Sequence, residues 1–133
     1  MAIKNETVIR GFAAFDLVVT TLFALPWTAK LVFALIYELH SILIDANAPH
    51  VAIDDLTLVF TNIMGVIGII WAIVRLRTPT REYARYDAIG RLCVAALFLW
   101  YIAGTLTPIF LFFVVTELVG GIWQLLLPAK PAD

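Results

Sequence analysis

Long runs of apolar residues constrain this chain more than any other feature of its sequence. Residues 56–75, 88–106 and 108–127 each approach the length of about 20 residues that a helix needs to cross the hydrocarbon core of a bilayer. A fourth run, 10–26, is shorter, but tilt and flanking residues can compensate. Since 62% of the 133 residues are hydrophobic, an aqueous core of this size could not bury them all. The sequence therefore predicts a single all-α domain over 1–133, an integral membrane four-helix bundle.

The segment 28–44, TAKLVFALIYELHSILI, follows the first predicted span. A helix continuing through both would contain about 35 residues and measure about 52 Å, which is longer than a bilayer requires. Pro26 provides a break, and Trp27, Lys30 and Tyr37 suit the membrane–water interface. We therefore expect an additional interfacial helix after the first span. The alternative is that this segment forms a fifth span, which would reverse the topology of everything that follows it.

Positive charges are distributed unevenly along the chain. The segment 45–55 contains three acidic residues and no lysine or arginine. Lysines and arginines lie instead near the two ends of the chain and around the connection between spans 56–75 and 88–106. By the positive-inside rule, both termini and this connection are cytoplasmic, an arrangement that four spans satisfy and five do not. These basic residues are Lys4, Arg10, Arg75, Arg77, Arg81, Arg85, Arg91 and Lys130.

Apart from the arginines at the ends of the spans, three charged residues lie within them: Asp16 in the first, Arg91 near the start of the third, and Glu117 near the middle of the last. Such groups are rare in lipid and normally face the interior of the bundle. Glu117 shares one helix face with Gly121 and Gln124, at spacings of four and three. Small residues on that face permit close helix contact. Comparable faces occur at Gly65, Gly68 and Ala72 and at Ala13, Asp16 and Thr20.

We predict that Asp16, Arg91 and Glu117 meet inside the bundle, because Asp16 and Arg91 lie at similar depths and an arginine side chain is long. Asp87 is one turn before Arg91 and can pair with it locally. The cluster could line a small-molecule site or a proton path. Alternatively, the charges could only neutralise one another and hold the helices in register. The sequence leaves both interpretations open.

Three further residues complete the candidate ligand or proton site: Gln124, Asn62 and Tyr101. Asn62 lies about as deep in its span as Asp16 does, but from the opposite side. Tyr101 could line a pocket, although aromatic residues in such spans more often pack or mark the interface.

Several chemistries find no support in the sequence. The formal net charge of -1 provides no basic surface for nucleic acid. Cys93 is the single cysteine, which excludes an intramolecular disulfide and a CxxC site. His40 and His50 lack the accompanying ligands of a metal site, and no haem, nucleotide-binding or hydrolase motif occurs. We therefore expect no metal, no cofactor and no catalytic residues.

Three stretches carry a resemblance to a known group of proteins. They are the proline-broken FALPWTAKLVFALI, the arginine-rich RLRTPTREYARYDAIGRL and the final TPIFLFFVVTELVGGIWQ with its carboxylate. Together they resemble the DoxX-like superfamily of small four-span bacterial membrane proteins. The resemblance covers most of the chain and implies that Arg91 and Glu117 are its family-like polar positions. It implies no common activity, since members are tied variously to oxidoreductase partners, redox stress and membrane-protein assembly.

Small multidrug transporters offer a second comparison, because they also combine four spans with one membrane glutamate. Their glutamate belongs to the first span, whereas Glu117 is in the last and the first span carries Asp16 instead. This departure makes the transporter resemblance poor.

These observations predict a bacterial inner-membrane protein, multi-pass, with both termini cytoplasmic. We expect it to bind a lipid-like or small hydrophobic ligand, or a partner membrane protein, through the polar interior of the bundle. Membrane lipid is its expected surrounding, and the glycine faces permit a homo-oligomer. The alternative is a proton-coupled small-molecule transporter that uses Glu117. An enzyme is less well supported, since no nucleophile with a matching base is visible.

Overall fold

The structure is a computed structural model that describes residues 5–48 and 51–128. Within these ranges the chain contains helices and no strand. In chain order the elements are α1 (Asn5–Ala24), α2 (Pro26–Leu43), α3 (Asp55–Arg77), α4 (Arg81–Gly104), the short 3-10 helix η1 (Pro108–Phe110) and α5 (Leu111–Leu125). The predicted all-α bundle is confirmed.

Four helical segments are long and apolar enough to cross a membrane, namely α1, α3, α4 and η1 together with α5. The chain is therefore built as a multi-pass membrane protein, and α2 is not among the four. The helix bounds agree closely with the predicted spans except at two helix starts. α1 begins at Asn5 rather than near residue 10, and α4 begins at Arg81 rather than near residue 88. The hydroxyl of Thr80 explains this early start, because it accepts a hydrogen bond from the Tyr83 amide at 3.2 Å and caps the helix.

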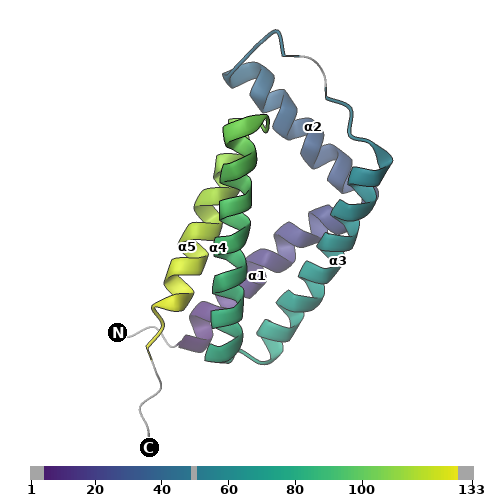
Figure 1. Cartoon of the computed structure of the whole chain (residues 1–133). Helices are drawn as coiled ribbons and strands as arrows, with labels where there is room; N and C mark the ends of the chain where they lie inside the picture. The colour runs from purple at the N-terminus through teal and green to yellow at the C-terminus, as the bar shows by residue number, and fades with distance from the viewer. Residues whose placement is uncertain (1–4, 49–50, 129–133) are drawn as a thin grey trace, which may run out of the picture.

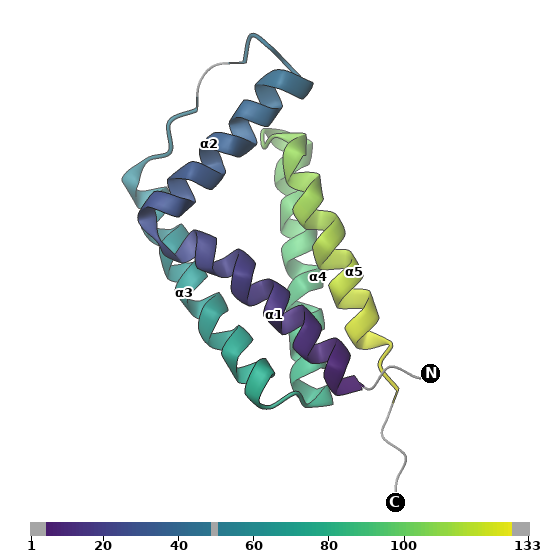
Figure 2. The same cartoon turned by 180° about the vertical axis from the view of Figure 1, so that it is seen from behind.

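The chain bends between α1 and α2, as the proline predicts. Leu25 is extended, with φ -105° and ψ 131°, and Pro26 is the first residue of α2. Proline suits that position because it has no amide hydrogen to leave unpaired. Figures 1 and 2 show that α2 is inclined to α1 and lies at the opposite end of the bundle from the connection between α3 and α4.

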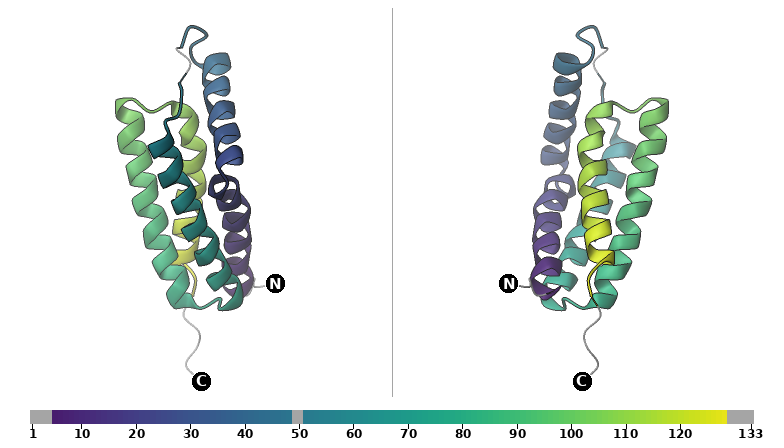
Figure 3. Two further views of the ribbon diagram at one scale, coloured as in Figure 1. Left: turned by 90° about the vertical axis from the view of Figure 1, so that its right-hand side faces the viewer. Right: turned by 90° about the vertical axis from the view of Figure 1, so that its left-hand side faces the viewer.

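The four long helices form two pairs, α1 with α3 and α4 with α5, which Figures 1 and 2 show side by side. Contacts between the two pairs are few among the described residues. At one end α2 reaches η1, where His40 Nδ1 lies 2.8 Å from Thr107 Oγ1. At the other end Asn5 donates a hydrogen bond to the Pro128 carbonyl at 3.0 Å, so the two ends of the described chain meet there (Figure 3).

Two glycines let α1 and α3 approach closely. A Cβ atom at Gly65 would lie 2.7 Å from the Ala24 Cα atom, and one at Gly68 would lie 2.5 Å from the Thr20 methyl group. Both distances are too short for any other residue without movement of the neighbour. The stripe of small residues in the sequence is therefore the contact face between these two helices.

Exposure along α3 is the reverse of the pattern in a water-soluble protein. Ile63, Ile67 and Ile70 are 49%, 52% and 58% exposed, whereas Arg75 is 1% exposed. Such a helix satisfies its backbone internally and presents its apolar side chains to lipid. The charged side chains of Arg75 and Arg91, in contrast, are buried inside the bundle.

Candidate functional site: a cavity bordered by an ion cluster

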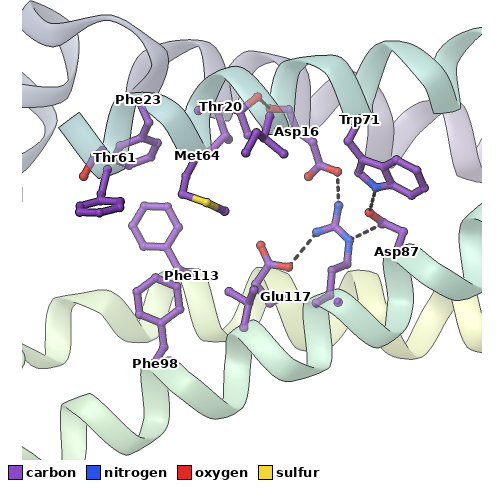
Figure 4. Close-up of a pocket in the computed structure, with 18 of the residues that line it drawn as sticks. Asp16, Thr20, Phe23, Thr61, Met64, Trp71, Asp87, Phe98, Phe113 and Glu117 are labelled. Atoms are coloured by element: carbon purple, nitrogen blue, oxygen red, sulfur yellow. Dashed lines mark hydrogen bonds and ion pairs between the residues drawn. The ribbon is translucent and has the colours of Figure 1, made fainter. Parts of the chain in front are cut away.

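Arg91 lies at the centre of a buried ion cluster. Its Nε donates to Asp87 at 2.7 Å, its Nη1 donates to Glu117 at 3.1 Å, and its Nη2 donates to Asp16. Figure 4 shows these three carboxylates converging on one guanidinium group. The structure thus brings together Asp16, Arg91 and Glu117, as the sequence predicts, although they come from α1, α4 and α5.

Arg75 is a second cation in the cluster that sequence analysis missed. The positive-inside rule predicts a cytoplasmic position for Arg75, yet it is 1% exposed, pairs with Asp16, and has Nη1 2.7 Å from Asp87. A signal for this was present, because Arg75 follows Ala72 by three residues and so continues the small stripe from Gly68. The charge of Arg75 favours a place in the connection between α3 and α4, whereas its helical spacing from Ala72 favours a place inside the bundle.

Asp87 has the largest number of partners in the cluster. Besides the two arginines, it accepts hydrogen bonds from Trp71 Nε1 at 2.8 Å and from Gln124 Nε2 at 2.7 Å. Its side chain is 7% exposed. The predicted local pair with Arg91 is therefore one part of a network that joins α3, α4 and α5, and Gln124 belongs to it.

The formal charges of the five ionisable groups do not balance. Asp16, Asp87 and Glu117 contribute three negative charges, and Arg75 and Arg91 contribute two positive charges, leaving a formal charge of -1. An unbalanced charge is expensive to hold away from water. A proton or a cation at the cluster would remove the imbalance.

A cavity of about 880 Å³ lies between the two helix pairs and borders the cluster. This volume falls within the range of about 300–1,000 Å³ that is usual for small-molecule sites. Along α3 its lining extends from Leu56 to Arg75, which is about 28 Å of helix axis. The cavity is therefore nearly as long as the hydrocarbon core is thick.

The two ends of the cavity differ in chemistry. Asp16 and Glu117 lie at one end, and their side chains are 15% and 21% exposed. At the other end Phe98 stacks on Phe110 and Phe113, with ring centroids 5.6 and 5.9 Å apart. Figure 4 shows the Glu117 carboxylate at the border between the ions and the space in front of these aromatic rings. The site is polar at one end and apolar along the rest.

The cavity is open at its side. Ile9, Ala84 and Leu127 form a separate buried apolar cluster at the end where the described chain ends meet, outside the lining of the cavity. At the side, lining residues of α3 and α4 are exposed, among them Met64 at 62% and Val94 at 40%. A molecule would therefore reach the cavity from the lipid between α3 and α4.

Two predicted site residues lie elsewhere. Asn62 donates a hydrogen bond to the Phe23 carbonyl at 2.8 Å and does not line the cavity. Its amide satisfies the last turn of α1, which explains a polar residue at that depth. Tyr101 is 59% exposed and is also absent from the lining, because it lies on the outward face of α4. Neither residue joins the ion cluster.

The comparisons with known proteins add no relative: no family model matches the chain, and neither a curated protein nor a solved structure is significantly similar to it.

Proposed function

We propose that this protein binds a lipid-like or small hydrophobic ligand in the cavity between its two helix pairs. The observation that carries the proposal is the cavity itself, which is large, mostly apolar, polar at one end and accessible from the side. Sites of this kind, with a few convergent polar groups on an apolar wall, are typical of small-molecule binding. No set of side chains for covalent chemistry is needed, so the proposal is for a non-enzymatic protein.

A photoreactive alcohol tests this proposal directly. The protein in phosphatidylcholine nanodiscs would be irradiated with a dodecanol that carries a diazirine in mid-chain, and the labelled peptides identified by mass spectrometry. We expect saturable labelling around Val94, Phe98 and Phe113, which line the cavity. Diffuse labelling of lipid-facing residues, without saturation, would contradict ligand binding and would favour docking of a partner protein or a second copy.

A matched pair of variants makes the test specific. Val94→Trp places a large side chain at the lining of the cavity, and we expect it to abolish saturable labelling. Leu97→Trp makes a similar change on the same helix at a residue that is 59% exposed and outside the lining. It should leave the labelling unchanged.

A proton-coupled transporter that uses Glu117 is the second candidate. Glu117 supports it, because it is the most exposed carboxylate of the cluster and borders the cavity. Transport requires proton movement, so uptake of a substrate into proteoliposomes would respond to a pH gradient and cease in Glu117→Gln. Binding that leaves the pH of a weakly buffered sample unchanged would argue for a binding protein instead.

We further propose a bacterial inner-membrane location with both termini cytoplasmic. Exposed arginines, Arg10, Arg77 and Arg85, support this orientation because they lie toward the end where α3 joins α4. Exposed Asp45 and Asp54 lie toward the opposite end.

In this orientation α2 lies at the outer interface, as its composition predicts. Trp27 is 68% exposed, and Lys30 and Glu38 are exposed on the same helix. Tryptophan and charged residues are favoured where lipid meets water.

The kinship with DoxX-like proteins stays a proposal. It is supported by the break at Pro26, by Arg91 in the arginine-rich segment and by Glu117 in the last span.

A further inference from the structure

We propose that the ligand of the cavity is a single-chain or compact hydrophobic cation, whose positive head lies against Glu117 and whose apolar body extends toward Phe98 and Phe113. This inference rests on the proposed function and adds the chemical class of the ligand. Two observations support it: carboxylates are the accessible groups of the ion cluster, and the formal charge of the cluster is unbalanced.

The accessible part of the cluster consists of carboxylates. The side chains of Glu117 and Asp16 are 21% and 15% exposed, whereas those of Arg91 and Arg75 are 5% and 1% exposed. The arginines are occupied in holding the helices together, and their guanidinium groups are covered. A ligand in the cavity therefore meets negative charge first.

Glu117 is held less tightly than its neighbours. Among the described residues its side chain has one ion-pair partner, Arg91 at 3.1 Å, whereas Asp16 and Asp87 each contact two arginines. The excess negative charge is thus best assigned to Glu117, the carboxylate that borders the empty volume in Figure 4. An ammonium or similar head would neutralise it, with a gain that a low-dielectric surrounding enlarges.

The remaining wall suits the body of such a molecule. Aromatic rings are favourable neighbours for a cation and for apolar groups alike. Rings from three different helices, those of Phe23, Phe98 and Phe113, lie along the space beyond Glu117, as Figure 4 shows. The length of the lining along α3 accommodates an extended chain.

A phospholipid fits this site less well than a free amphiphile. Its phosphate would lie close to its amine, and so beside Asp16 and Glu117, where like charges repel. Bilayer phosphatidylcholine is therefore a weak competitor, and nanodiscs made of it provide a suitable background for the test.

Competition among three twelve-carbon probes tests the inference. Displacement of the photoreactive dodecanol would be measured with dodecyltrimethylammonium, dodecanol and dodecyl sulfate. We expect the cation to compete at a concentration about tenfold lower than the alcohol, which corresponds to one favourable ion pair after desolvation. The anion should be the weakest competitor.

Glu117→Gln should remove the advantage of the cation over the alcohol, so that the two compete at similar concentrations. Glu38→Gln, which removes an exposed carboxylate outside the cavity, is the matched control and should retain the advantage. Retained labelling by the alcohol also shows that the Glu117 variant is folded. Should that variant fail to fold, an ammonium probe with its diazirine beside the head tests the same contact in the unaltered protein, by labelling at Glu117.

The outcomes separate the inference from the function on which it rests. Equal competition by cation and alcohol, preference for the anion, or labelling of the aromatic end by the head-proximal diazirine would each overturn the cationic ligand while leaving hydrophobic binding intact. Absence of any saturable labelling by the alcohol would overturn the proposed function itself.

Discussion

Arg75 and Arg77 are two residues apart on α3 and have opposite surroundings. Arg75 is 1% exposed and contacts Asp16 and Asp87, whereas Arg77 is exposed at the helix end. The difference arises because residues two apart in a helix point in different directions. One arginine therefore belongs to the interior and the other to the interface.

We expect Arg75→Met to reduce the free energy of unfolding by about 3–5 kcal/mol, because it leaves Asp16 and Asp87 with one arginine fewer inside the bundle. Arg77→Met should change it by less than about 0.5 kcal/mol, as exposed substitutions usually do. Denaturation in mixed micelles, followed by circular dichroism, measures both. Equal stability of the two variants would mean that water, rather than the arginine, solvates the carboxylates.

At the scale of elements, glycines allow close approach within both helix pairs. A Cβ atom at Gly65 of α3 would lie 2.7 Å from the Ala24 Cα atom of α1, and one at Gly121 of α5 would lie 3.2 Å from the Ala88 carbonyl oxygen of α4. Gly90 of α4, in contrast, has open space beside it. Between the pairs the ion cluster provides much of the contact, since other contacts are few. The cavity lies where the two pairs are not in contact.

A comparison of two alanine substitutions checks the close approach of α1 and α3. Gly65→Ala should destabilise the protein by about 1–3 kcal/mol, because its Cβ would collide with the backbone of α1 near Ala24. Gly90→Ala meets no atom within 4 Å and should be neutral, or stabilising by up to about 1 kcal/mol through helix propensity. Thermal unfolding in the same nanodiscs measures both changes. A stable Gly65→Ala protein would show that α1 and α3 are packed less closely.

At the scale of the whole molecule, the two ends of the bundle differ in the charge of their exposed side chains. Exposed arginines lie toward the end where α3 meets α4, and exposed aspartates lie toward the other end, near α2 and the start of α3. All four spanning segments run between these two ends. Finding which side of the membrane one end faces therefore fixes the side that the other end faces.

Cysteine labelling tests this orientation. In a Cys93→Ser background, Asn47→Cys should react with a membrane-impermeant maleimide in intact cells, whereas Thr78→Cys should react only after lysis. Both positions are exposed. Asn47 follows α2, whereas Thr78 lies in the connection between α3 and α4, which is at the opposite end of the bundle from α2 (Figure 1). The reverse pattern would invert the proposed topology, and with it the assignment of α2 to the outer interface.

The sequence by itself determined the four spans, the break before Pro26 and the meeting of Asp16, Arg91 and Glu117. These features can be predicted from the sequence for two reasons. The length of an apolar run shows whether a helix can cross the bilayer, and a charged side chain within a span must have a partner inside the bundle.

Only the tertiary structure decided which polar residues share that interior and what lies beside them. Arg75 belongs to the cluster, and Asp87 contacts Arg75, Trp71 and Gln124 in addition to its predicted partner Arg91. Asn62 and Tyr101 lie outside the cluster. The cavity likewise depends on how far apart the two helix pairs stand. The physical reason is that side chains distant in sequence set the spacing between helices. In addition, an apolar residue that faces lipid and one that lines a cavity contribute equally to a hydropathy pattern, so the pattern does not distinguish them.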